Sequence, residues 1–145
     1  MVDGRWWLAA MAAGLLSVLV GCGDNDPQAK RAISGTVTLD GAPVANGSLS
    51  FQPEQPGGTA SGAVIANGKY AVPREHGLPV GKYKVLIFAP KPGTGQLPPG
   101  GMPGDPLPPA EELIPPEYNI NSSQFIEVPV KGPYQFDFKI LGKKG

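Results

Sequence analysis

Apolar and polar residues alternate along most of the chain after residue 32, which is the pattern of half-buried β-strands. Asp40-Gly41 and Asn67-Gly68 interrupt the alternation at points where tight hairpin turns are expected. Several short strands joined by such turns favour an all-β antiparallel sandwich of two sheets. The predicted strands are seven, at residues 33–39, 49–51, 61–66, 69–72, 82–88, 126–130 and 134–140.

The same alternation predicts which side chains form the core. In residues 82–88, the large side chains of Tyr83, Val85 and Ile87 share one face of the strand. By the same reasoning, Val37, Phe136 and Phe138 are expected to point inward from other strands, so these residues should meet in a common core.

Residues 90–116 break the pattern, because they contain ten prolines and five glycines in 27 residues. Proline has no N–H to donate to a β-ladder, so we predict a long loop inserted between two strands. Within it, residues 110–114 are expected to form one helical turn. Loops of this length are usually either functional or disordered. The extended pieces Leu97-Pro98-Pro99 and Leu107-Pro108-Pro109 resemble segments that dock to partner proteins, whereas a flexible covering loop is the alternative.

The N-terminal segment carries a targeting pattern. Arg5 precedes an apolar run of 15 residues, at positions 6–20, which is shorter than the roughly 20 residues that a membrane-spanning helix needs. The run is therefore expected to be a secretory signal. The following residues, Gly23 to Arg31, include no large apolar side chain and are expected to form a flexible tether.

The end of this run, Leu19-Val20-Gly21-Cys22, resembles the lipobox of bacterial lipoproteins. The resemblance implies cleavage between Gly21 and Cys22 and attachment of lipid, including acyl chains such as palmitate, to Cys22. It divides the chain into a signal peptide (1–21), a lipid-anchored tether (22–31) and a β-domain (32–141). The implied location is extracytoplasmic, on the periplasmic face or the cell surface of a bacterium. A plain signal peptide and an uncleaved anchor are the alternatives.

Composition excludes several classes of function. Twelve Lys and Arg balance twelve Asp and Glu, so the chain lacks the basic excess that nucleic-acid binding requires. One Cys and one His are too few for a disulfide framework or a zinc site. We therefore expect no nucleic-acid partner, no metal and no cofactor.

The candidate catalytic groups are isolated from one another. His76 lies beside Glu75 in a polar stretch and is expected to be a solvated surface residue. Glu111 and Glu112 are adjacent, so they would point apart on a helical turn and form a solvated acidic face. The serines lack a nucleophile elbow, and the acidic cluster at residues 24–26 lacks the Gly and Glu of a calcium loop. No catalytic or ligand-binding residue is assigned, and we expect no enzymatic activity.

The run at residues 33–47, which includes Gly35, Val37 and the turn Gly41-Ala42-Pro43-Val44, resembles the opening of carboxypeptidase-regulatory-like domains. The segment Leu78-Pro79-Val80-Gly81-Lys82-Tyr83-Lys84-Val85 resembles their second signature. Together with the lipobox, residues 113–119 also look like part of a family of small bacterial lipoproteins built on this domain. The resemblance implies a seven-stranded, transthyretin-like, Ig-like sandwich.

Two functions remain open after these observations. The first is a non-enzymatic cell-envelope module, structural or interacting with proteins, that is held on the membrane through Cys22 and contacts an envelope protein through the proline-rich loop. The alternative is a lipoprotein that binds a carbohydrate or a peptide. Sugar sites use exposed aromatic platforms, and both tryptophans, Trp6 and Trp7, lie within the predicted signal.

Overall fold

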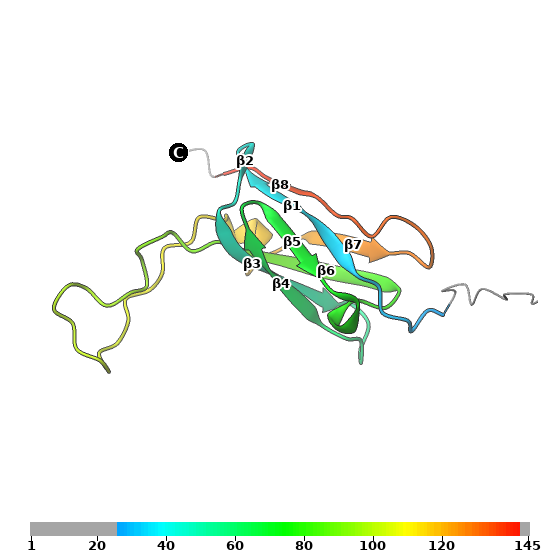
Figure 1. Ribbon diagram of the computed structural model, residues 1–145, viewed down its shortest axis with the longest axis horizontal. Coiled ribbons are helices and arrows are strands. Elements are labelled where there is room, and N and C mark those ends of the chain that lie inside the picture. Colours follow the sequence, from blue (N-terminus) through cyan, green and yellow to red (C-terminus); the bar gives the residue numbers. More distant parts are fainter. Residues whose placement is uncertain (1–25, 143–145) are drawn as a thin grey trace, which may run out of the picture.

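The computed structural model describes residues 26–142, which form eight β-strands, two short 3-10 turns and no α-helix (Figure 1). The predicted signal peptide, residues 1–21, and Cys22 lie outside the described residues. The strands are β1 Ile33–Leu39, β2 Ala42–Pro43, β3 Asn46–Pro53, β4 Ser61–Ala66, β5 Lys69–Val72, β6 Gly81–Phe88, β7 Gln124–Val128 and β8 Phe138–Ile140, and the 3-10 turns are η1 Arg74–His76 and η2 Pro116–Tyr118.

Hydrogen bonds connect the strands in the order β2-β1-β5-β4-β3-β6-β7, and β8 pairs with β1. Every pairing is antiparallel except that of β1 with β8. The sheet is curled like half of a barrel, so that one of its faces encloses the core (Figure 1). The prediction of an all-β, mainly antiparallel protein is confirmed.

Two-residue turns set the register of two hairpins. Asp40 and Gly41 have φ angles of 50° and 84°, and Asn67 and Gly68 have φ angles of 50° and 74°. Positive φ at both central residues is what a type I′ turn requires, and Asn, Asp and Gly adopt it most readily. The first turn leads into β2, which at two residues is too short for the alternation pattern to predict.

The inner face of the sheet carries the core. Tyr83, Val85 and Ile87 of β6 are buried, as their shared face predicts. Strands on both sides of β6 contribute the same alternation, so the buried side chains form one cluster. Its fully buried members include Phe51, Ile33, Ile65, Leu78, Ile114, Ile140, Val37, Val72 and Val128.

Phe136 and Phe138 point toward this core but are only partly buried. Both belong to the C-terminal segment that runs beside β1, and among residues 26–142 no strand pairs with the other side of this segment. The rings therefore pack at the margin of the core, where the Phe138 ring centroid lies 6.2 Å from that of Tyr70. The predicted inward direction is correct, whereas full burial, which Val37 and Val85 do reach, is not attained.

Residues 89–123, between β6 and β7, contain no strand. Figure 1 shows much of this segment, in yellow-green, extending away from the sheet. The expectation of a helical turn at residues 110–114 is wrong. Glu112 instead forms a β-bridge with Pro90, and the Leu113 N–H donates to the Ala89 carbonyl, so this stretch is extended.

Candidate functional site

Residues 26–31, called the docked segment here, precede β1 and lie against the sheet at one end of the molecule. The Val80 N–H donates to the Pro27 carbonyl, which fixes residue 27 against the residues that lead into β6. The Arg31 and Leu78 backbones exchange two hydrogen bonds. Residues 26–31, which the sequence pattern assigned to a flexible tether, therefore belong to the folded domain.

Arg31 holds this docked segment in place from within. Its side chain is buried, with 4% of its surface exposed, and its guanidinium donates to the carbonyls of Asp26, Ala29 and Val130. The Arg31 Nε also donates to the Tyr134 hydroxyl over 3.3 Å. A buried arginine whose donors reach carbonyls on separate segments links those segments rigidly, because each carbonyl left unsatisfied by its loss would be costly.

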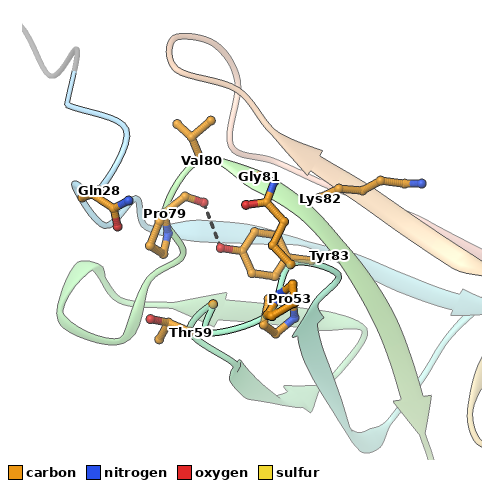
Figure 2. Close-up of a pocket in the computed structure, with 12 residues that line it drawn as sticks. Gln28, Pro53, Thr59, Pro79, Val80, Gly81, Lys82 and Tyr83 are labelled. Atoms are coloured by element: carbon orange, nitrogen blue, oxygen red, sulfur yellow. Dashed lines mark hydrogen bonds between the residues drawn. The ribbon is translucent and has the colours of Figure 1, made fainter.

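A polar hollow of about 180 Å³ lies beside the docked segment (Figure 2). Most of its wall comes from residues 53–59, which start at the end of β3, and from residues 79–83, which lead into β6, and Gln28 completes it. Figure 2 shows the Tyr83 ring between Pro53 and Pro79, and the Tyr83 hydroxyl donates to the Pro79 carbonyl over 3.1 Å. Burial raises the pKa of this hydroxyl above its ordinary value.

The opposite end of the molecule bears the proline-rich loop. Its base, residues 89–94 and 110–114, is called the loop stem here, and residues 95–109 are called the proline tip. Two backbone bonds close the stem: the Lys91 N–H donates to the Glu111 carbonyl and the Leu113 N–H donates to the Ala89 carbonyl. The Lys91 ammonium lies 2.9 Å from the Glu111 carboxylate on the surface.

Glu112 secures the stem to the sheet. One of its carboxylate oxygens accepts hydrogen bonds from the Ala89 N–H at 2.7 Å and from the Ile114 N–H at 3.0 Å. Glu111 and Glu112 were expected to form a solvated acidic face, but the structure gives each a separate structural partner. The sequence offered no sign of this, because Lys91 and Ala89 lie on the other side of the loop, about 20 residues earlier in the chain.

An apolar groove of about 260 Å³ opens where the stem meets the sheet. Leu39, Pro43, Val44, Ala89 and Leu113 are among the residues that line it. Exposed apolar side chains gather around this end of the molecule. They are Leu97, Met102 and Leu107 of the proline tip, Leu113 of the stem, Ile120 beyond it and Leu141 after β8.

The structure does not assemble the residues that carry potential chemistry. His76 is exposed in η1, and its carbonyl accepts a hydrogen bond from the Ser61 hydroxyl. Ser122, which is buried, donates to the Val85 carbonyl and so ties the start of β7 to β6. Among residues 26–142, no three His, Cys, Asp or Glu side chains lie close enough together to hold a metal ion.

One polar cluster of the sheet has perturbed acidity. Asp137 accepts hydrogen bonds from the Thr36 hydroxyl and the Thr36 N–H, both at 2.8 Å, and these bonds lower the pKa of its carboxyl. Burial, together with the nearby negative charge of Asp137, raises the pKa of Tyr70. Both groups support strand pairing, since Thr36 lies in β1 and the Tyr70 hydroxyl bonds to the Phe136 carbonyl.

The sequence matches no protein-family model, and comparisons with curated proteins and with solved structures gave no match. Within the described part of the chain, no helix is long and apolar enough to cross a membrane. The functional proposal therefore depends on the residues of this chain alone.

Sequence reasoning missed the structural roles of Arg31, Glu112 and Asn119. Asn119 is buried, and its amide bridges the turn after Ile114 by donating to the Ile114 carbonyl and accepting from the Ile120 N–H. Most partners of these three side chains are backbone carbonyl and N–H groups, which residue types do not reveal, and the Tyr134 hydroxyl that contacts Arg31 is remote in sequence.

Proposed function

We propose that this protein is a lipid-anchored module of the bacterial cell envelope that acts without catalysis. The observation that carries the proposal is Leu19-Val20-Gly21-Cys22 at the end of an apolar run that follows Arg5. Cys22 is the single cysteine of the sequence, and it stands at the position where a lipoprotein carries its lipid. Two or three acyl chains at this residue suffice for stable anchoring, because each buried CH₂ contributes about 0.8 kcal/mol.

The domain itself is proposed to be a transthyretin-like sandwich related to carboxypeptidase-regulatory-like domains. The turn in its first signature corresponds to the β1–β2 hairpin, and its second signature leads into β6. Gly35 of the first signature lies where β1 meets the C-terminal segment, and a Cβ there would stand 1.8 Å from the Phe136 carbonyl oxygen. These signature residues therefore have structural roles, which supports a scaffold rather than an active site.

The proline tip is proposed to be the element that contacts an envelope protein. It is held by a hydrogen-bonded stem, and Met102 and Leu107 expose 72% and 61% of their surface. Exposed leucines beside paired prolines suit a partner whose groove is lined by aromatic side chains, because extended proline segments lose little entropy on binding.

A second candidate function is the binding of a small polar ligand, such as a carbohydrate or a peptide end. The polar hollow beside Gln28 favours it, since Gln28 and Thr59 line a space of about 180 Å³. A thermal-shift series with sugars and short peptides tests this function, because a ligand that binds only the folded state raises its stability. Thr59→Trp, which fills the hollow, is the control and should abolish any such shift.

Lipidation is tested on protein purified from membranes of the native host. Mass spectrometry should show a chain that starts at Cys22 and exceeds its sequence mass by acyl groups. Cys22→Ser should release the protein from the membrane fraction, whereas Ser17→Ala, which keeps the cysteine, should not. A chain that starts at Met1 with an unmodified thiol would refute the proposal.

A further inference from the structure

The covalent distance between Cys22 and the folded domain is short. Asp26 is the first residue whose position the structure describes, and its carbonyl accepts hydrogen bonds from the Ala29 N–H and the Arg31 guanidinium. Four residue steps separate Cys22 from Asp26, and a chain of that length spans at most about 14 Å in any conformation. A lipid on Cys22 therefore lies within about 14 Å of this end of the domain.

The start of the folded domain is held firmly, because residues 26–31 form hydrogen bonds on two sides. Pro27 bonds to Val80, and Arg31 joins the segment to Val130 and Tyr134. Only three residues separate Cys22 from Asp26, so a lipid on Cys22 would bring the surface around residues 26–31 close to the bilayer.

The proline tip lies at the other end of the molecule. Val80 directly precedes β6, and the loop stem directly follows it. An eight-residue strand measures about 23 Å from its first to its last residue, so the stem is separated from the docked segment by most of the domain's length. Figure 1 shows the N-terminal part of the chain, in blue, and the loop at opposite ends of the longest axis.

The surface around the docked segment has the chemistry of a headgroup contact. Lys30 and Lys131 are exposed there, and Arg74 lies beside them. Asp26 and Glu75 add two exposed acidic groups to the three basic groups Lys30, Arg74 and Lys131. Val130, which directly precedes Lys131, exposes 39% of its surface and adds a small apolar contact. Basic side chains near a membrane surface are attracted to anionic lipids.

We propose that the domain stands on the membrane, with the surface around Lys30, Val130 and Lys131 against phospholipid headgroups and the proline tip held at the far end, away from the bilayer. This inference rests on the proposed lipid at Cys22. It identifies the second contact of the module as the lipid surface itself and places the tip where it meets a protein in the envelope space.

Single tryptophans report this orientation. The processed chain, which starts at Cys22, contains no tryptophan, because Trp6 and Trp7 are removed with the signal. Lys131→Trp, Val64→Trp and Met102→Trp each introduce one reporter at an exposed site, at the membrane end, the side and the tip. The lipidated variants are placed in vesicles of phosphatidylcholine and phosphatidylglycerol that carry a quencher near the headgroups.

We expect strong quenching at position 131 and almost none at positions 64 and 102. Inserting a flexible Gly/Ser segment of about 20 residues between Asn25 and Asp26 should lower the quenching at 131, because the domain is then free to move away. Quenching at 102 equal to that at 131 would overturn the proposal and show that the tip enters the bilayer. Quenching at 64 would overturn it in favour of a domain lying on its side.

The same samples separate the two proposals. A chain that keeps Trp6 and Trp7 and an unmodified Cys22 refutes the lipid anchor, and the orientation falls with it. A chain that carries lipid but shows equal quenching at all three sites refutes the orientation alone.

Discussion

Gly35 of β1 lies directly opposite Tyr70 of β5, and the Tyr70 hydroxyl donates to the Phe136 carbonyl over 2.7 Å. A Cβ at residue 35 would stand 2.9 Å from that hydroxyl and 1.8 Å from the carbonyl oxygen. The missing side chain of Gly35 therefore leaves the space in which the phenol and the C-terminal segment meet. Three segments distant in sequence depend on this one contact.

Gly35→Ala should destabilise the domain, although alanine is a better strand residue than glycine. The added methyl collides with backbone, which cannot yield without moving the C-terminal segment away from β1, and such overpacking costs about 1–3 kcal/mol. Urea unfolding followed by circular dichroism measures this loss. Ser34→Ala, at the neighbouring exposed site, is the control and should stay close to wild type. Equal stability of the Gly35→Ala and Ser34→Ala variants would show that the close approach of Phe136 to residue 35 does not limit the stability of the domain.

Tyr70→Phe should lower the free energy of unfolding by about 1 kcal/mol at neutral pH, the usual net value of one hydrogen bond. The substitution should also change the alkaline limb of stability. Because the folded pKa of Tyr70 is raised, the unfolded chain releases its proton first, and wild-type stability falls as the pH rises above about 10. The variant should show a shallower fall. Part of the fall should remain in the variant, because the pKa of Tyr83 is also raised. A fall as steep as that of the wild type would contradict the role of Tyr70.

Asp137→Asn should flatten the acid limb. The hydrogen bonds from Thr36 lower the pKa of the Asp137 carboxyl, so the unfolded chain takes up a proton before the folded one does. The stability that this carboxylate provides is present above about pH 4 and is lost as the pH falls further. Thr36→Val removes one of the two donors and should give an intermediate acid limb. Unfolding curves recorded between about pH 2 and 6 test the order wild type, Thr36→Val, Asp137→Asn.

Local patterns predicted some strands with their bounds and others only in part. The strand predicted at residues 126–130 is β7 at Gln124–Val128, and of the strand predicted at residues 134–140 only Phe138–Ile140 forms β8. Residues 61–66 and 69–72 form β4 and β5 with the expected bounds, because Asn67-Gly68 fixes both the turn and the alternation on either side. The direction of the core side chains followed from the same period of two. The depth of burial did not follow from this period. Phe136 and Phe138 are only partly buried because, among the described residues, no strand pairs with the far side of the C-terminal segment, and the sequence pattern does not reveal strand order.

Contacts between remote segments were beyond the sequence pattern. Residues 26–31 were predicted to be part of a flexible tether because they are hydrophilic. In the structure the Asp26 carbonyl accepts from the Arg31 guanidinium and the Pro27 carbonyl accepts from the Val80 N–H, and these bonds hold the segment against the domain. The stretch before Pro115 read as a helical turn because alanine, glutamate and leucine favour helices. Pairing with the strand exit at Ala89 and Pro90 overrides that preference.

Glu112→Ala should destabilise the domain more than Glu111→Ala, although the two residues are adjacent. Glu112 satisfies the N–H groups of Ala89 and Ile114, both buried residues, and leaving such donors unpaired costs about 1–3 kcal/mol. Glu111 only pairs with Lys91 at the surface, where an ion pair contributes about 0–1 kcal/mol. Thermal unfolding of the two variants gives the comparison. A larger loss in Glu111→Ala would show that the stem is held by charge instead.

Replacing residues 96–108 by a short Gly/Ser linker should leave the melting temperature within a few degrees of wild type. The deletion removes Leu97, Met102 and Leu107, which are exposed, and it keeps the stem contacts of Thr94, Glu111 and Glu112. Closure entropy changes by only about 0.6 kcal/mol per doubling of loop length, so shortening the tip costs little. Extending the deletion through Ile114, which is 2% exposed, is the matched contrast and should unfold the domain or lower its melting temperature sharply. A collapse caused by the shorter replacement would show that the tip covers core, and it would remove the tip as a free partner-binding element.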